Sequence, residues 1–358
     1  MEVNVEAESQ NSLANFEFIT GKEWQLLDNH NKETYINKAF SYWRYRGFPF
    51  PTFSSDEVCK HFRQLQSINS TRIFLPGNEL ASFPTGLALA NYFHPQIWSV
   101  SFKGHRTPMQ CFFDDNLLKA CLRQALTLWP DRKGASERCL RDMLRTYRHT
   151  RRVSNFRPTV AKALYDRYSK PGDKILDFCA GYGGRLLGCL TLPRHYIGYD
   201  PCKMQVEGLK KTYKTLMANG LPKGTAEIRE ACAEDEMLLE KSASFDLIFT
   251  SPPYFNLEKY SNEHSQSYIR YPSYSEWREK FLSVVVSQSH RLLKPGGYLI
   301  LNVLDSEKAS IATDTLIYSI NKFSLLTKYQ LRLSTLPFHR VNGTVHYHFE
   351  PVFVFLKT

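Results

Sequence analysis

The sequence predicts an α/β protein with an open, doubly wound and mostly parallel sheet, and three features of its second half indicate this fold. From residue 174 onward, short apolar segments alternate with segments of helical periodicity, as in strands joined by crossover helices. A glycine-rich segment follows the first apolar stretch, which is where such folds bind ligands. The last two apolar stretches are long, which favours an antiparallel pair at the sheet edge.

Residues 1–150 have a different pattern and are expected to form a mainly helical N-terminal region, separate from residues 151–358. A helix is predicted over residues 23–46, ending at Gly47. Another is predicted over residues 114–128, between a pair of aspartates and a proline.

A third N-terminal helix is predicted after Ser136, and it carries arginines at alternating steps of three and four residues. This spacing places the guanidinium groups along one helix face: Arg138, Arg141, Arg145, Arg148 and Arg152. The face is either simply solvated or a contact surface for a phosphate backbone, because aligned like charges repel unless a polyanion or water relieves them.

The second half has a regular order of expected strands and helices. The expected strands are 174–178, 196–199, 226–229, 245–250, 298–303, 329–335 and 346–356. One helix is expected directly after the glycines, and the others are 204–219, 274–293 and 311–321. Asn342 and Gly343 are expected in the loop that joins the last two strands.

Composition limits the classes of function. Lys and Arg number 46 against 35 Asp and Glu, and this net charge of +11 favours a polyanionic partner. None of the 8 cysteines forms a C-x-x-C pair, so no zinc site, and no metal, is expected. The opening residues are polar, and no run of 18 apolar residues occurs, so neither a signal peptide nor a membrane span is expected. The cysteines are therefore expected to be reduced, in the cytoplasm or a nucleus.

The glycine-rich segment runs from Asp177 to Gly184 and has the character of a nucleoside-binding loop. Asp200 follows the next expected strand, where a carboxylate can accept hydrogen bonds from ribose hydroxyls. The spacing G-x-G-G departs from the dinucleotide pattern G-x-G-x-x-G. A carboxylate at Asp177 would repel a pyrophosphate but could bind the ammonium group of a methionine moiety. The loop therefore favours S-adenosylmethionine over a nicotinamide dinucleotide.

On these residues, the chain resembles the class I methyltransferases over about residues 153–358. The resemblance implies a Rossmann-like, seven-stranded sheet that ends in an antiparallel hairpin. It implies that the methionine end of the cofactor meets Asp177, Phe178, Cys179, Ala180, Gly181 and Gly183, and that the ribose meets Asp200.

Two further segments resemble cofactor-binding motifs of this family. Family members often have an acidic residue after the third strand that binds adenine. Cys232 stands where Asp is common, so Glu234 or Asp235 is expected in this role. Residues 154–158 resemble the amino-terminal cofactor motif of DNA amino-methyltransferases, which implies cofactor contacts by Asn155, Phe156 and Arg157.

The segment Ser251-Pro252-Pro253-Tyr254 directly follows the expected strand 245–250 and suits chemistry on a planar amine. The nitrogen lone pair of an exocyclic base amine is delocalised into the ring, so the amine is a poor nucleophile. Hydrogen bonds from its N–H groups to the Ser251 hydroxyl and the Pro252 carbonyl can localise that lone pair. Consecutive prolines fix φ and hold this carbonyl rigid. The Tyr254 ring can stack on the base.

This tetrapeptide resembles the S/D/N-P-P-Y/F/W motif of DNA amino-methyltransferases. The serine form is most similar to that of cytosine-N4 enzymes, whereas aspartate is commoner in adenine-N6 enzymes. The resemblance implies site-specific DNA methylation that uses S-adenosylmethionine, with cytosine N4 favoured over adenine N6. An RNA base amino-methyltransferase remains an alternative, and so does a catalytically silent nucleic-acid-binding module on the same fold.

Contacts with nucleic acid are expected from two regions. Phe255, Tyr260 and Arg270 follow the catalytic loop, and aromatic side chains beside arginine suit base stacking and phosphate contact. Little sequence follows the final strand pair, so any dedicated target recognition is expected within residues 1–150, with the arginine face as a candidate contact.

Overall fold

The computed structural model describes residues 16–148, 150–151, 153–306, 309–334, 339–341 and 344–358. The chain divides into a smaller unit, Met1–Thr52 with Pro95–Val153, and a larger unit, Phe53–His94 with Ser154–Thr358. This division differs from the expected boundary at residue 150, because Phe53–His94 belongs to the larger unit. Its apolar side chains, including Phe62 and Leu65, are fully buried in a core shared with the helices after residue 154.

The larger unit is built on one mixed sheet. Its strands are β1 (Phe74–Leu75), β2 (Glu79–Leu80), β4 (Lys174–Asp177), β5 (His195–Asp200), β6 (Thr225–Glu230), β7 (Phe245–Thr250), β9 (Leu293–Asn302), β10 (Ser324–Arg332) and β13 (Phe349–Leu356). Their order is β1-β2-β10-β13-β9-β7-β4-β5-β6. Strands β9, β7, β4, β5 and β6 are parallel, and β13 pairs antiparallel with both β9 and β10. The predicted fold class is confirmed, and β1 and β2 add two short strands to the seven expected.

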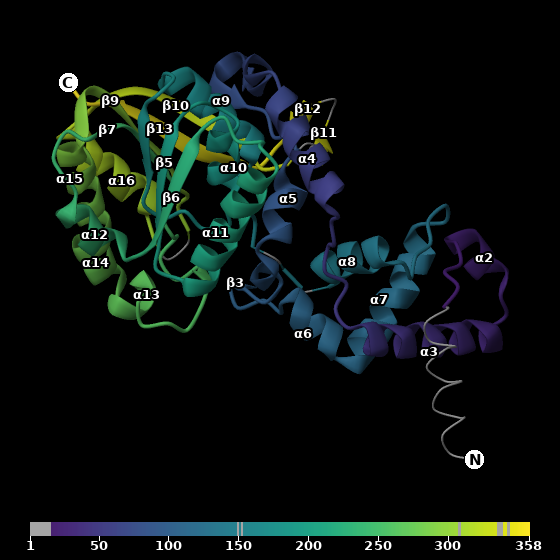
Figure 1. The fold of residues 1–358 in the computed structure, drawn as a ribbon. Helices are drawn as coiled ribbons and strands as arrows, with labels where there is room; N and C mark the ends of the chain where they lie inside the picture. Colours follow the sequence, from purple (N-terminus) through teal and green to yellow (C-terminus); the bar gives the residue numbers. More distant parts are fainter. Residues whose placement is uncertain (1–15, 149, 152, 307–308, 335–338, 342–343) are drawn as a thin grey trace. The chain divides into compact units, whose positions relative to one another are not determined.

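Helices cover both faces of this sheet (Figure 1). One face packs against α4 (Ser55–Ser67), α5 (Leu87–Tyr92), α9 (Pro158–Tyr168), α10 (Gly184–Leu190) and α11 (Lys203–Ala218). The other packs against α12 (Ala233–Leu239), the π-helix η4 (Arg278–Leu282), α15 (Ser283–Leu292) and α16 (Ile311–Ile320).

The central strands are mainly apolar because both of their faces are buried. Along β7, Leu247 and Phe249 join the core on the α9 side, whereas Ile248 joins the core on the α15 side. Alternate side chains of a strand point to opposite faces, so a sheet covered on both sides needs a continuous apolar run. Such apolar runs are the pattern from which these strands are predicted.

The segment Phe53–His94 is fastened to α9 by a buried lysine. The ammonium group of Lys162 donates hydrogen bonds to the carbonyls of Leu65, Gln66 and Ile68, at 3.3, 2.6 and 2.6 Å. These carbonyls belong to the last turn of α4 and to its C-cap residue, where the regular helical hydrogen bonds end. A cation at a helix C-terminus also interacts favourably with the helix dipole.

Other short elements complete the larger unit. They are η1 (Ser70–Ile73), η2 (Pro76–Asn78), β8 (Glu258–Lys259), α13 (Ser267–Arg270), α14 (Tyr274–Trp277) and the antiparallel pair β11 (His339–Val341) and β12 (Thr344–His346). The expected pairing of the last long strands is confirmed as β10 with β13. Asn342 and Gly343 lie outside the described residues.

The smaller unit is mainly helical, as expected. It contains α2 (Gly21–Leu26), α3 (Asn29–Arg46), η3 (Pro95–Trp98), β3 (Ser101–Phe102), α6 (Pro108–Phe113), α7 (Asp115–Leu128) and α8 (Glu137–Thr146). The predicted helix 23–46 is interrupted, because Asp28 caps a new helix with its side chain. Among the described residues, no helix combines the length and apolarity needed to span a bilayer.

Candidate active site

The Ser-Pro-Pro-Tyr segment lies where β7 ends, at the carboxyl edge of the parallel strands. Ser251 Oγ and Tyr254 Oη each lie 3.4 Å from Asn302 Oδ1, at the end of β9, and 3.5 Å from each other. Carboxyl ends of adjacent parallel strands form the ligand-binding edge of doubly wound sheets. The side chains of Ser251 and Tyr254, two residues of the predicted catalytic loop, therefore converge at this edge.

A buried carboxyl group on β13, the strand next to β9, lies close to Tyr254. Tyr254 Oη lies 3.4 Å from Glu350 Oε2. Val352 pairs with Asn302, so Glu350, two residues earlier, extends past the end of β9 on the same sheet face. Burial raises the pKa of Glu350 and also that of Tyr254. The sequence analysis missed Asn302 and Glu350, although each is a polar residue at the end of an apolar strand.

Two predicted contact residues near the loop have different roles. Phe255 was expected to contact nucleic acid, but it is 6 % exposed and packs against Tyr274 and Trp277. Its φ of 53° turns the side chain into the core at the end of the loop. Tyr260 donates a hydrogen bond from its hydroxyl to Glu258, and its ring lies 6.0 Å from that of Tyr182 in the glycine loop.

The glycine loop adopts the conformation that its sequence predicts. Gly181 and Gly183 have φ of 56° and 74°, in the left-handed region that favours glycine. A Cβ on Gly181 would meet only the Cys179 carbonyl, at 3.8 Å, so the space in front of this residue is open. Phe178 is fully buried in the core, so only its backbone is available to a ligand.

Asp200 lies directly beside this loop. Its carboxylate accepts hydrogen bonds from the N–H groups of Gly181 and Cys202, at 2.8 and 2.9 Å. Burial raises the pKa of Asp200 to about 6. In the described part of the chain, no cation forms an ion pair with it. A carboxylate beside an open glycine loop fits the hydroxyl groups of a ribose.

Asp177 does not have the role that the sequence predicts. Its carboxylate is fully buried and accepts hydrogen bonds from Arg185 Nε, Tyr196 Oη and Thr250 Oγ1, each at 2.8 Å. Both oxygens are therefore used, and the charge is balanced by a buried guanidinium. The expectation that Asp177 binds a methionine ammonium group is wrong for this arrangement. The residue instead ties β4, β5, β7 and α10 together beneath the site.

The segment before α9 lies against the glycine loop, as its motif implied. Asn155 Nδ2 donates to the Tyr182 carbonyl at 2.8 Å. The Phe156 carbonyl would lie 2.1 Å from a Cβ on Gly184, so only glycine fits there. The guanidinium of Arg157 donates to Ser82 Oγ and the Leu333 carbonyl, both at 2.9 Å.

The candidate adenine-binding carboxylates are paired within the chain. Arg270 forms ion pairs with Glu234 at 2.6 Å and Asp235 at 2.8 Å. Arg270 was expected to contact nucleic acid, but its charge is already balanced. Glu234 and Asp235 lie in the first turn of α12, where carboxylates are favoured by the helix dipole.

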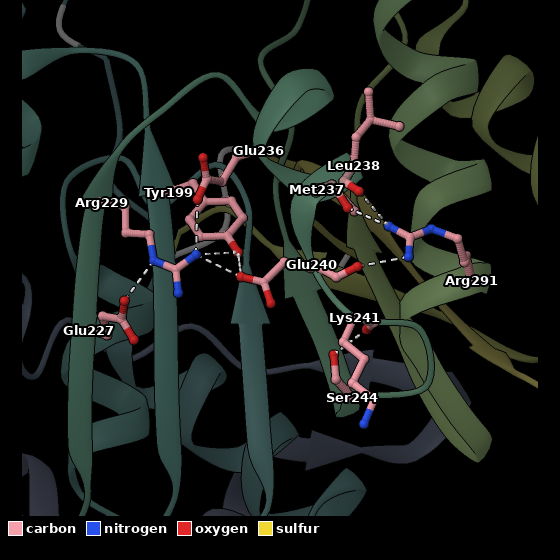
Figure 2. A network of polar contacts seen from close by, with 10 residues as sticks. All are labelled: Tyr199, Glu227, Arg229, Glu236, Met237, Leu238, Glu240, Lys241, Ser244 and Arg291. Atoms are coloured by element: carbon pink, nitrogen blue, oxygen red, sulfur yellow. Dashed lines mark hydrogen bonds and ion pairs between the residues drawn. The ribbon is translucent and has the colours of Figure 1, made fainter.

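Polar contacts fix the position of α12 (Figure 2). Arg229 on β6 forms ion pairs with Glu236 and Glu240, at 2.9 and 2.7 Å. On the other side, Arg291 donates to the carbonyls of Met237 and Glu240, at 2.6 and 2.8 Å, at the end of the helix. The first turn of α12 is therefore held beside the end of β6.

The arginine face of the smaller unit is not a continuous row of free cations. Arg141 pairs with Glu137 at 2.7 Å and donates to the Pro49 carbonyl, and Arg145 lies 3.3 Å from Asp142. The helix ends at Thr146, so Arg148 lies beyond it, and Arg152 is outside the described residues. Arg138 and Arg148 remain exposed. The prediction of one aligned face is wrong in this respect, because the helix is too short.

Solved structures similar to this chain include three SAM-dependent or related proteins. A TehB-like SAM-dependent methyltransferase from Corynebacterium glutamicum is 16% identical, over 57% of this chain and 90% of that one, with a TM-score of 0.34. TrmN from Thermus thermophilus is 16% identical, over 68% and 79%, with a TM-score of 0.39. A SAM-dependent methyltransferase from Methanosarcina mazei is 14% identical, over 54% and 96%, with a TM-score of 0.37.

The search of curated proteins gives no significant match. The family model described as DNA methylase, of the N6/N4 methyltransferase type, matches residues 245–358. This match begins at β7, includes the Ser-Pro-Pro-Tyr segment and ends with β13. The carboxyl-terminal third of the chain, which contains the candidate catalytic loop, is therefore similar to DNA methylases.

Proposed function

We propose that this chain transfers a methyl group from S-adenosylmethionine to the exocyclic amino group of a DNA base, with cytosine N4 favoured over adenine N6. The observation that carries the proposal is the convergence of the Ser251 and Tyr254 hydroxyls on Asn302 at the carboxyl edge of the sheet. The match of residues 245–358 to DNA methylases supports it. The net charge of +11 suits a polyanionic substrate.

The residues around the glycine loop fit the proposed cofactor. Asp200 would accept hydrogen bonds from the ribose, and the open space at Gly181 allows a close approach by the methionine end. Gly183 is instead covered by His94 and Leu209, so its role is to turn the backbone. When bound there, S-adenosylmethionine would supply an electrophilic methyl group on a sulfonium centre. No metal is required for this displacement, in which orientation provides much of the acceleration.

The catalytic loop would bind and orient the amine. Ser251 Oγ can accept one N–H of the amine, and the carbonyl of Pro252, fixed by the proline rings, can accept the other. Stacking of the base on Tyr254 would contribute roughly 1–3 kcal/mol. A base in a duplex must leave the helix to reach this loop. We propose that the smaller unit contributes to target binding, with Arg138 and Arg148 among its exposed cations.

The test is the transfer of a labelled methyl group to duplex DNA, single-stranded DNA and RNA, followed by hydrolysis to nucleosides. We expect label in DNA as N4-methylcytosine. Label in N6-methyladenine would overturn the base preference, and label in RNA alone would overturn the DNA substrate. Cofactor binding without transfer to any of the three would favour a silent binding module. Ser251→Ala should lose transfer, whereas Ser67→Ala, an exposed serine at the end of α4, should not.

A further inference from the structure

Amine methylation leaves one proton that the enzyme must accept, and this inference rests on the proposed function. The nitrogen lone pair forms the new N–C bond, and the C–S bond breaks with its electron pair left on sulfur. The product nitrogen then carries a positive charge, which it loses when an N–H bond breaks and its electrons stay on nitrogen. The hydroxyls of Ser251 and Tyr254 cannot retain that proton, because a neutral hydroxyl is a very weak base.

A carboxyl group that could retain it lies one contact beyond the loop. Glu350 Oε2 is 3.4 Å from Tyr254 Oη, and Tyr254 Oη is 3.5 Å from Ser251 Oγ. These three groups form a chain from the position of the amine to the last strand of the sheet. Asn302 fixes the chain, because its Oδ1 faces both hydroxyls and its Nδ2 donates to the Pro351 carbonyl at 3.2 Å.

We propose that Glu350 is the terminal acceptor of the amine proton, which reaches it through the Tyr254 hydroxyl. Ser251 takes the proton from the amine and passes its own to Tyr254, which in turn passes its own to Glu350. Both hydroxyls therefore stay neutral, and Glu350 becomes a carboxylic acid. Glu350 thus acts through Tyr254, as a positioning and proton-accepting residue. It releases the proton to solvent before the next cycle.

A second buried carboxyl group, Glu258 on β8, interacts electrostatically with Glu350. The charges of Glu258 and Glu350 repel, and burial together with this repulsion raises the pKa of Glu258 to about 7. At Glu350, hydrogen bonds from Asn302 and Tyr254 and the charge of Arg157 lower the pKa and so oppose the effect of burial. At Glu258, Tyr260 donates a hydrogen bond to the carboxylate. Two coupled carboxyl groups titrate in two steps that belong to the pair. The pair therefore gains its proton-accepting form as pH rises.

The first test is the pH profile of single-turnover methyl transfer. The wild-type rate should rise with pH along an acid limb. Glu350→Gln should lower the rate by about 10²–10⁴-fold, as expected for loss of a proton acceptor, and remove the limb. Glu258→Gln should move the limb to lower pH, because repulsion is removed. Glu350→Asp should restore part of the rate. Glu207→Gln, on the exposed face of α11, is the matched control and should keep the wild-type profile.

The second test uses the cofactor-free protein, so it stands apart from activity. The infrared band of protonated carboxyl groups, followed against pH, should show a transition near neutral pH that shifts to lower pH in Glu350→Gln. If that variant does not fold, Tyr254→Phe should still lose the acid limb. An unchanged limb in both variants, or an unchanged infrared transition in Glu350→Gln, overturns the proposal. A wild-type protein that methylates no nucleic acid would instead overturn the proposed function, while the infrared test would still decide whether the two carboxyl groups are coupled.

Discussion

Replacing Asp200 by Asn tests two effects of its buried carboxylate: its cost to the free energy of unfolding and its contribution to cofactor affinity. The Asp200 carboxyl is 8% exposed, and burial raises its pKa from 3.8 to about 6. An acid with a raised pKa in the folded state stabilises the fold below its unfolded pKa, and this contribution is lost as pH rises to the folded value. About 2 pKa units correspond to about 3 kcal/mol. The cofactor-free wild type should therefore lose this much between about pH 4 and pH 7, relative to Asp200→Asn.

The comparison between two pH values removes the effect of altered hydrogen bonds. Asn has one acceptor oxygen, whereas Asp200 accepts from both Gly181 and Cys202, so the variant loses about 1–3 kcal/mol at either pH. The part of these hydrogen bonds that depends on ionisation is already contained in the folded-state pKa of Asp200, which they lower. The difference in free energy of unfolding between variant and wild type should therefore change by about 2–3 kcal/mol in favour of the variant as pH rises.

The assay is urea unfolding at both pH values, with calorimetric titration of S-adenosylmethionine. Asp166→Asn, an exposed residue on α9, is the control and should show no change with pH relative to wild type. Asp200→Asn should bind the cofactor at least about tenfold more weakly, equivalent to one charged hydrogen bond. If the variant shows the same pH dependence as wild type and unchanged binding, neither the buried charge nor its ribose contact exists as described.

Four other variants test the remaining contacts. Tyr254→Ala should lose methyl transfer but retain cofactor binding by calorimetry, and loss of both would contradict its place at the substrate. Lys162→Met should lower the free energy of unfolding by about 3 kcal/mol in urea, because the α4 carbonyls lose a charged donor; an unchanged midpoint would refute this. Gly184→Ala should cost about 3 kcal/mol from overlap with the Phe156 carbonyl, and a neutral effect would contradict the packing. Arg141→Ala combined with Arg145→Ala should leave the salt dependence of DNA affinity unchanged, because both residues are already ion-paired; a flatter slope would restore them as phosphate contacts.

The strands were predictable from the sequence because each depends on its own residues. β7 is apolar on both faces and ends at a proline pair, so both its interior and its end are visible in one short segment. The Ser-Pro-Pro-Tyr segment was equally visible, because its chemistry depends on adjacent residues. These features needed no knowledge of distant contacts.

The missed features depend on residues far apart in the chain. Phe53–His94 contains helices and two short strands whose packing partners follow residue 154, so local periodicity did not assign it to the larger unit. Glu350 reaches Tyr254 only because β13 runs antiparallel beside β9, with Val352 opposite Asn302. The predicted helix after Ser136 was too long for a related reason. The spacing of its arginines predicts that they share one helix face, but it does not show that the helix ends at Thr146.

The sequence predicts that the charge of Asp177 selects the cofactor. In the structure, the carboxylate that contacts the glycine loop from the cofactor side is that of Asp200. Arg185 lies eight residues after Asp177, as the second residue of α10, and its guanidinium neutralises the Asp177 carboxylate in the core. Asp200 is bound only by backbone N–H groups in the described structure, one of them from the glycine loop itself. The hydroxyls of a ribose would donate to the Asp200 carboxylate. A carboxylate at this position also binds the ribose in dinucleotide enzymes, so the feature that disfavours a dinucleotide is the G-x-G-G spacing of the loop rather than the charge of Asp200.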